Sequence, residues 1–296
     1  MYINNIDECM EPAAIVSKFA DDTKIGRVVK TEEDQKKLQR EVDNMMKWAN
    51  DYQMSFNTAK CKVLHIGKKN QRFDYKIYQV LEKTECERDV GVLISNDLKP
   101  AQQCAKAAKK AYSVLGRISR AFTFRDKVVW TKLYKTFVRP QLEFANSSWS
   151  PITVADKNLL ESVQKKAVMQ ISNMPGMTYT ERLEHLNLPT LEERRTRGDL
   201  IMVWQLLTHY VDIDHKKFFD FVEPEPSQHT RHSSNKLNLK INPFRTEIRK
   251  NSFSIRAAKT WNELPIEIRE ARTLNSFKNK YDDHKKVDKM LLKSQY

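Results

Sequence analysis

The chain has 296 residues, of which 40% are hydrophobic and 30% are charged. This length fits one large domain or two ordinary ones, with enough apolar residues for a core. No run reaches the roughly 18 apolar residues of a membrane-spanning helix. The start, MYINNIDECM, lacks the basic and apolar stretches of a secretory signal, so we expect an intracellular protein of the nucleus or cytoplasm, not a secreted one. Six glycines are few for this length, which argues against glycine-rich nucleotide folds and all-β architectures and favours a mostly helical protein.

A strong excess of basic residues points to a polyanionic partner. The chain carries 52 Lys and Arg against 38 Asp and Glu, a net charge of +14. A field of this sign favours nucleic acid first and an anionic membrane surface second, although a basic protein without such a partner has the same composition. Cys9, Cys61, Cys86 and Cys104 form no CxxC pair, so the sequence signals neither a zinc site nor a disulfide framework and fits a reducing compartment.

The N-terminal part of the chain predicts short strands around one helix. Two β-capable runs, AAIVSKFA and TKIGRVV, flank Asp21 and Asp22 and predict a hairpin. Thr31 with Asp34 is a helix-start pattern, and this helix should end near Ser55. A strand from Lys62 to Ile66 and a strand pair, DYKIYQVLE with RDVGVLIS, complete an expected α+β sheet layer. The apolar face of the helix is predicted to carry Leu38, Val42, Met45, Ala49 and Tyr52.

Helices dominate the prediction after Pro100. A second helix, DKVVWTKLYKTFV, is expected to end before Pro140. Thr153 with Asp156 and Thr190 with Glu193 open two more, because each pair resembles a capping box ahead of an apolar period. The helix that directly follows Pro100 has an apolar stripe of Cys104, Ala107, Ala108, Ala111, Leu115 and Ile118. Its remaining surface carries Lys106, Lys109, Lys110, Arg117 and Arg120.

The C-terminal end of the chain divides at a polar segment. Residues 223–240 begin with EPEPSQHTRHSSNK, which predicts a linker or exposed loop. Residues 241–296 form a small basic and aromatic segment that we expect to dock on the helical part rather than fold alone. Its apolar anchors are Phe244, Phe253, Trp261, Leu264 and Phe277.

Phe19-Ala20-Asp21-Asp22 at a hairpin tip is the sharpest chemical signal. Two adjacent carboxylates at a strand end offer the oxygen ligands that Mg²⁺ prefers, and a pair of such ions activates an attacking hydroxyl and steadies a leaving phosphate. That chemistry needs carboxylates from more than one strand, because neighbouring side chains on a strand point to opposite faces. Taken alone, an Asp pair is far more typical of a solvated turn than of a metal site.

The surrounding sequence resembles a polymerase family. IVSKFADDTKIGR is similar to the catalytic [FY]ADD box of reverse transcriptases, and WANDYQMSFNTAKCKVLHIGKK to the W…LN..K segment that follows it in non-LTR, LINE-like retrotransposons. RDVGVLISNDL resembles the primer-grip hairpin, with Asp89-Val90-Gly91 where YLG-type residues are usual. LYKTFVRPQLEFANSSWSP, LLESVQKKAVMQI, ERLEHLNLPTLEERRTRGDLIMVWQLL and KTWNELPIEIREARTLNSFKNKYD resemble the region after the polymerase.

The resemblance implies roles for individual residues. Asp21 and Asp22 belong to the catalytic, metal-binding box, with Asp21 the stronger candidate for a direct Mg²⁺ ligand. Lys60 would protonate pyrophosphate or steady the deoxynucleoside triphosphate, and Asn57 would position that loop. The sequence fits equally well an ordinary surface lysine at Lys60 and a simple turn-forming asparagine at Asn57. The resemblance implies that Gly91 faces the primer end, although a glycine at this position also fits a bulge. The helix after Pro100 would be the thumb, and its cations would bind the primer and template: Lys106, Lys109, Lys110, Arg117 and Arg120. The same pattern also fits a solvated amphipathic face.

The implied architecture is a partial palm at 1–98 (β-hairpin, helix, short strands), thumb-like helices at 99–140 and a helical extension at 141–222. An RNA template, a DNA primer and two Mg²⁺ ions are the implied partners. Met1-Tyr2-Ile3-Asn4-Asn5 matches only the tail of the preceding family element, and Asp7 and Asp51 lie in no matching motif. We therefore expect a truncated reverse transcriptase that does not polymerise DNA by itself.

Two other classes of function stay open. The first is a non-catalytic nucleic-acid-binding protein that uses the basic helical surface, and the second is a protein-interaction module. His229 and His232 lack the further ligands of a tetrahedral zinc site. Trp149, Trp204 and Trp261 could stack on bases, but their apolar helical positions favour the core.

Overall fold

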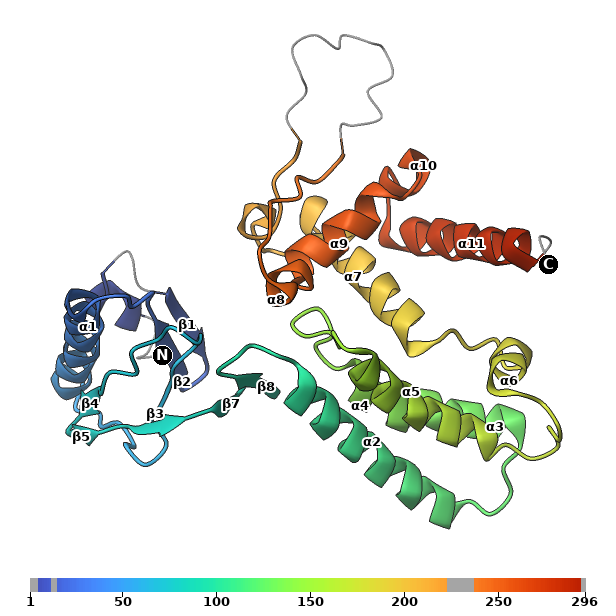
Figure 1. Cartoon of the computed structure of the whole chain (residues 1–296), viewed down its shortest axis with the longest axis horizontal. Helices are drawn as coiled ribbons and strands as arrows, with labels where there is room; N and C mark the ends of the chain where they lie inside the picture. The colour runs from blue at the N-terminus through green and yellow to red at the C-terminus, as the bar shows by residue number, and fades with distance from the viewer. Residues whose placement is uncertain (1–4, 12–14, 223–236, 294–296) are drawn as a thin grey trace, which may run out of the picture. The chain divides into compact units, whose positions relative to one another are not determined.

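The structure, a computed structural model, describes residues 5–11, 15–222 and 237–293. Its contacts separate two compact units, Met1–Lys99 and Pro100–Tyr296, which we call the N-terminal unit and the C-terminal unit. Both are shown in Figure 1. Helices combine with small antiparallel and parallel sheets, which confirms the α+β class in general terms. Among the described residues, no helix has the length and apolar composition that crossing a membrane requires.

The N-terminal unit holds the strands and one long helix. The predicted hairpin is confirmed, and so is the capping box in which Thr31 and Asp34 open α1. The elements are η1 (Ile6–Cys9), β1 (Ile15–Phe19), β2 (Asp22–Gly26), α1 (Glu32–Asp51), β3 (Lys62–Leu64), β4 (Lys76–Ile77), β5 (Gln79–Val80), β6 (Glu82–Thr84), β7 (Cys86–Asp89) and β8 (Val92–Ser95).

The expected single sheet layer is wrong. In the described residues the strands form four separate two-stranded sheets. DYKIYQVLE folds back on itself as β4 and β5, and β6 pairs in parallel with β3. The second run, with Cys86, forms its own hairpin of β7 and β8. Strands this short carry little pattern, so their partners are set by tertiary packing.

The core of the N-terminal unit is built on the apolar face of α1, which packs on η1 and β4 (α1 and β4 are labelled in Figure 1). Val42, Met45 and Ala49 are buried as predicted, whereas Leu38 is half-buried and Tyr52 is exposed. Trp48 completes this face, and its indole N–H donates to Asn5 Oδ1 at 3.3 Å. The other buried members of the cluster are Ile6, Tyr75, Ile77 and Leu81.

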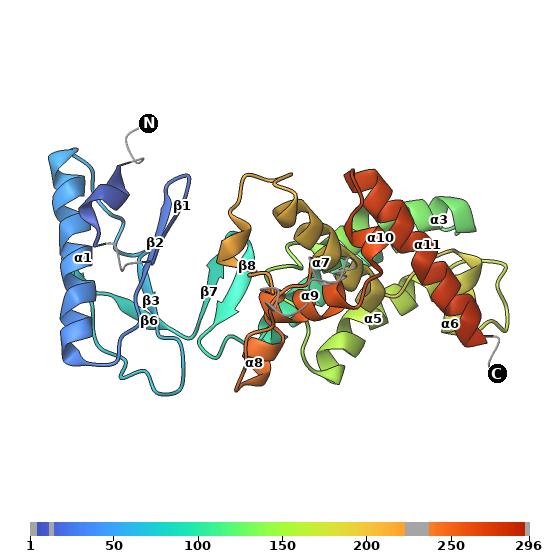
Figure 2. The ribbon, with the colours of Figure 1, turned by 90° about the horizontal axis from the view of Figure 1, so that it is seen from above.

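The described part of the C-terminal unit consists mainly of helices. α2 lies against α4 and α5, and α7 lies against α9 and α11 (Figure 1 and Figure 2). The elements are α2 (Ala101–Ala121), α3 (Lys127–Leu133), the π-helical turn η2 (Tyr134–Val138), α4 (Arg139–Glu143), α5 (Val154–Met169), α6 (Tyr179–His185), α7 (Leu191–Leu207), η3 (His215–Lys217), α8 (Glu247–Lys250), α9 (Phe253–Asn262), α10 (Ile266–Arg269) and α11 (Leu274–Lys293).

Pro140 does not end the second predicted helix. The helical path continues from α3 through η2 into α4, with Pro140 in the first turn of α4. A proline has no N–H and its ring collides with the carbonyl four residues earlier in an ordinary helix. The wider π turn comes directly before Pro140, where the regular bonding pattern is interrupted.

The basic and aromatic C-terminal segment shares a core with α7, as predicted. Trp261 is 1% exposed and Phe277 is 1% exposed, and their rings lie 5.9 Å apart between centroids. Both belong to one cluster with Leu200 and Trp204 of α7. Phe244, expected as an anchor, is instead exposed. Residues 223–236, most of the predicted linker, lie outside the described residues, as do His229 and His232.

Candidate nucleic-acid interface

The Asp21-Asp22 pair sits at the tip of the β1–β2 hairpin. Phe19 pairs with Asp22, which leaves Ala20 and Asp21 as the central turn residues. Ala20 has φ of 54°, a left-handed conformation that is uncommon for a residue with a Cβ atom. Both aspartates are exposed. The turn therefore presents two carboxylates to solvent on a tight, regular scaffold.

These carboxylates alone do not fit a two-metal site. In residues 5–11, 15–222 and 237–293, no three His, Cys, Asp or Glu side chains are grouped so that they could hold an ion. Octahedral Mg²⁺ pairs are held by carboxylates from more than one segment. The implied Mg²⁺ site stays a prediction, with Asp21 and Asp22 as its two named ligands.

Lys60 and Asn57 share a surface turn. The amide N–H of Lys60 donates to the carbonyl of Asn57 at 2.9 Å, and both side chains are exposed. Among the described residues, neither side chain forms a hydrogen bond or ion pair with Asp21 or Asp22. The geometry thus places these two residues together but does not join them to the Asp pair.

Gly91 lies in the tight turn between β7 and β8. Asp89 pairs with Val92, and the central residues Val90 and Gly91 have φ of 43° and 91°. Two positive φ values are typical of a type I′ hairpin turn, which glycine accepts without strain and valine does not. Lys24 of β2 forms an ion pair with Asp89. The Asp-Asp hairpin and the Gly91 hairpin are therefore linked within the N-terminal unit.

The cations predicted on the first helix of the C-terminal unit share one face of α2. At 100° per residue they fall within about a 100° arc. Cys104, Ala108, Ala111 and Leu115 are buried on the opposite side, and α2 contains no acidic residue. Lys109, Lys110, Arg117 and Arg120 are exposed and Lys106 is half-buried.

Four of these five cations are not neutralised by the rest of the described chain. Lys109, Lys110, Arg117 and Arg120 form no ion pair with any acid that the structure describes. From Lys106 to Arg120 the charges extend about 21 Å along the helix axis. We call these five residues the α2 basic face. Gly116 lies between them, and a Cβ added there would stand 3.8 Å from an Nη atom of Arg120.

α5 adds a cation that the sequence alone did not single out. Lys166 Nζ lies 5.4 Å from the ring centroid of Tyr112 on α2, a cation–π contact. The Tyr112 hydroxyl is 2.8 Å from Ser162 Oγ of α5, which holds the two helices in register. Lys166 and its neighbour Lys165 are both exposed. The sequence shows the Lys165-Lys166 pair within a helical pattern. Only the packing shows that this pair belongs to a helix that lies against α2.

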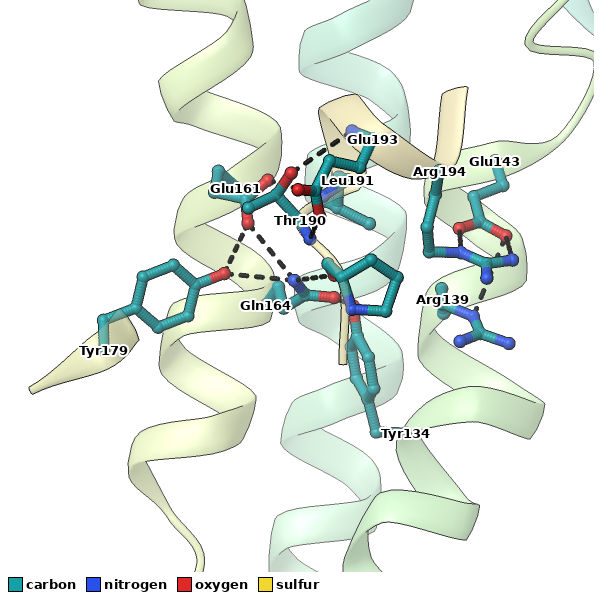
Figure 3. Close-up of polar contacts among 11 residues, drawn as sticks. Tyr134, Arg139, Glu143, Glu161, Gln164, Tyr179, Thr190, Leu191, Glu193 and Arg194 are labelled. Carbon is teal, nitrogen blue, oxygen red and sulfur yellow. Dashed lines mark hydrogen bonds and ion pairs between the residues drawn. The ribbon is translucent and has the colours of Figure 1, made fainter. Parts of the chain in front are cut away.

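A polar network fixes α5 against its neighbours (Figure 3). Gln164 is fully buried; its carbonyl oxygen accepts from the Tyr134 hydroxyl at 2.6 Å, and its amide donates toward Tyr179 Oη and the Pro189 carbonyl, both at 3.1 Å. Glu161 accepts from the Tyr179 hydroxyl and, at 3.0 Å, from the Leu191 amide that begins α7. Burial raises the pKa of Tyr134 well above its usual value. The network positions α5, and with it Lys166.

A second set of charges in the same view joins α4 to α7. Arg194 forms a two-pronged ion pair with Glu143, whose Oε2 accepts from Nη2 at 2.9 Å, and Arg139 Nε lies 3.8 Å from the same carboxylate (Figure 3). The bond to Glu143 raises the pKa of Arg194, whereas burial lowers that of Arg139. These cations support the fold and are not available to a ligand.

Trp149, Trp204 and Trp261 are core residues. They are 5%, 3% and 1% exposed, and each indole N–H donates to a backbone carbonyl. Their burial agrees with the predicted core role rather than with stacking on bases. Trp204 and Trp261 lie on helices as predicted, whereas Trp149 lies outside the helices, after α4. Comparison of the chain with protein families, curated proteins and solved structures found no match.

Proposed function

We propose that the chain binds duplex nucleic acid through the α2 basic face and Lys166, as the template–primer-binding part of a LINE-like reverse transcriptase. The observation that carries this proposal is the set of four exposed cations, Lys109, Lys110, Arg117 and Arg120, on a helix without a single acid. The order of motifs that resembles the reverse transcriptase family supplies the identity of the partner, an RNA template paired with a DNA primer.

Phosphate contact is the chemistry that this face suits. Lys and Arg side chains that neutralise backbone phosphates release condensed counterions, which gives affinity without sequence preference. A thumb-like helix needs that kind of contact, because it must hold any template–primer pair. The small residues Ala105, Ser113 and Gly116 lie among the cations, so the helix backbone can approach a phosphate strand closely.

Polymerisation is not expected from the chain as it stands. Asp21 and Asp22 are the catalytic pair that the resemblance implies, and they are not joined by a third acid among the described residues. We therefore propose that binding to template–primer does not depend on Asp21. Primer extension with Mg²⁺ should show no incorporation by either the unaltered chain or Asp21→Ala, and incorporation lost in the variant would contradict this view.

Two double variants with the same loss of charge test the binding proposal. Lys109→Gln with Arg117→Gln removes two exposed cations from the α2 basic face. Lys216→Gln with Arg249→Gln removes two exposed cations from η3 and α8, elsewhere in the C-terminal unit. Fluorescence anisotropy with a labelled template–primer should show affinity about tenfold or more lower for the first variant at low salt.

The control separates a local face from net charge. If both variants lose affinity equally, binding reflects overall charge and the α2 basic face has no special role. If the unaltered chain does not bind template–primer at low salt, nucleic-acid binding is wrong, and the interaction-module alternative takes its place.

A further inference from the structure

A polar cavity of about 140 Å³ lies within the C-terminal unit, where α5, α7 and α9 meet. Its lining includes three cations, Lys157, Arg195 and Arg256, against two carboxylates, Glu192 and Asp199. The volume corresponds to several water-sized spheres, so an ion of several non-hydrogen atoms fits. The α2 basic face is not part of this lining.

Two of the three cations are already paired. Arg256 donates to both carboxylate oxygens of Asp199, at 2.8 and 3.1 Å, and to backbone carbonyls including that of Asn251 at 2.9 Å. At the rim, Lys157 Nζ donates to Glu192 Oε1 at 2.5 Å. Both acids of the cavity are therefore neutralised by cations other than Arg195.

Arg195 is the unmatched charge. It is 5% exposed, and its buried Nη1 has no hydrogen-bond partner in the described structure. Glu161, the acid with the largest electrostatic effect on it, already accepts bonds from Tyr179 and the Leu191 amide. Burial lowers the pKa of Arg195 below its usual value, because desolvation disfavours the charged guanidinium. A buried guanidinium without an acceptor costs stability unless something supplies one.

We propose that this cavity is a binding site for a phosphate-class oxyanion, held by Arg195 from the inside and by Lys157 at the rim. Lys157 uses one of its three N–H groups on Glu192, which leaves donors for an anion. Ser150, in the segment before α5, also lines the cavity and carries a hydroxyl that can donate. Donors on separate segments suit a tetrahedral group with several oxygens, and arginine is the residue best fitted to phosphate.

Isothermal titration of the full chain with inorganic phosphate tests the site. Low millimolar phosphate at constant ionic strength should give saturable one-site binding that is independent of the α2 basic face. Arg195→Gln should weaken it by about 10- to 100-fold, as expected for lost hydrogen bonds to a charged group. The matched control is Arg249→Gln, which replaces an exposed arginine of α8. This variant should bind phosphate as the unaltered chain does.

A rim variant keeps the test decisive if Arg195→Gln does not fold. The Lys157 side chain is 40% exposed. Lys157→Gln should therefore leave the melting temperature almost unchanged while weakening phosphate binding severalfold. The proposal would be overturned if the unaltered chain shows no saturable phosphate binding. It would also be overturned if Arg195→Gln and Lys157→Gln both bind phosphate as tightly as the unaltered chain.

Further titrations distinguish the source of the phosphate group. A nucleoside monophosphate and a 5′-phosphorylated oligonucleotide are each compared with the form that lacks the phosphate. Tighter binding of the phosphorylated strand through Arg195 identifies the end of a nucleic acid as the ligand, and binding of inorganic phosphate alone identifies a free ion. Both results support the site, because each depends on the same guanidinium.

Discussion

Gln164 shows how a single buried residue fixes the position of the proposed binding surface. Its side chain bonds to groups on η2, α6 and the segment before α7, while α5 carries Lys166 next to Tyr112. The apolar period of α5 predicts a buried stripe that includes Leu159, Leu160 and Val163; the last two are buried, but Leu159 is exposed. Periodicity does not reveal Gln164, because its burial depends on partners that are distant in sequence.

Gln164→Leu should destabilise the C-terminal unit by about 1–3 kcal/mol for each buried partner left unsatisfied. Tyr134→Phe removes only the hydroxyl that donates to Gln164, so its effect should be smaller, about 1 kcal/mol. Urea denaturation followed by circular dichroism measures both. Equal stability of Gln164→Leu and the unaltered chain would show that the network does not hold α5 in place.

His65 gives the N-terminal unit a pH dependence. It is 9% exposed, its Nε2 has no hydrogen-bond partner among the described residues, and burial, with smaller effects of Lys83 and Arg72, lowers its pKa. The unfolded chain therefore binds a proton more readily than the folded one. This contribution to stability is present above the unfolded pKa of about 6.5 and is lost as the pH falls below it.

Urea midpoints at pH 7.5 and pH 5.5 test this expectation. The unaltered chain should be less stable at the lower pH, and His65→Gln should show a smaller difference because the titrating group is gone. A variant with the same pH dependence as the unaltered chain would assign the effect to other groups.

At the scale of elements, local patterns predicted the helices well and the strand pairings poorly. Thr31, Thr153 and Thr190 accept the capping bonds that their spacing to an acid predicted. These bonds join residues three apart, so the sequence contains all the information. The pairing of β3 with β6 joins segments separated by a loop and two other strands, and the π turn before Pro140 depends on packing, so neither follows from a local pattern.

The capping box at Thr190 should contribute measurably to the C-terminal unit. Its hydroxyl accepts from the Glu193 amide at 3.2 Å, and Glu193 accepts in return from the Thr190 amide at 2.9 Å. Thr190→Ala should cost about 1 kcal/mol, and Thr190→Ser should cost much less because serine also caps. Thermal melts of the two variants make the comparison, and equal melting temperatures would contradict a capping role.

For the whole molecule, net charge and helical period together predicted the α2 basic face but not the cavity around Arg195. The predicted cations of α2 lie on the side opposite its buried residues, because the helical period alone sets the angular positions of residues around one helix. The cavity draws residues from α5, α7 and α9, and no spacing in the sequence brings those together. Asp21 and Asp22 lie at a hairpin tip as predicted, but two-metal chemistry there requires further ligands that the described residues do not supply.

The salt dependence of template–primer binding is the most direct test of the proposed α2 interface. The logarithm of the association constant should fall linearly with the logarithm of salt concentration, because phosphate contacts release counterions. Replacing Lys109 and Arg117 by Gln should reduce the magnitude of that slope by about 1 for each cation, while Lys216→Gln with Arg249→Gln should leave it unchanged. A slope that is the same in the α2 variant and the unaltered chain would contradict the central claim that α2 holds the nucleic acid.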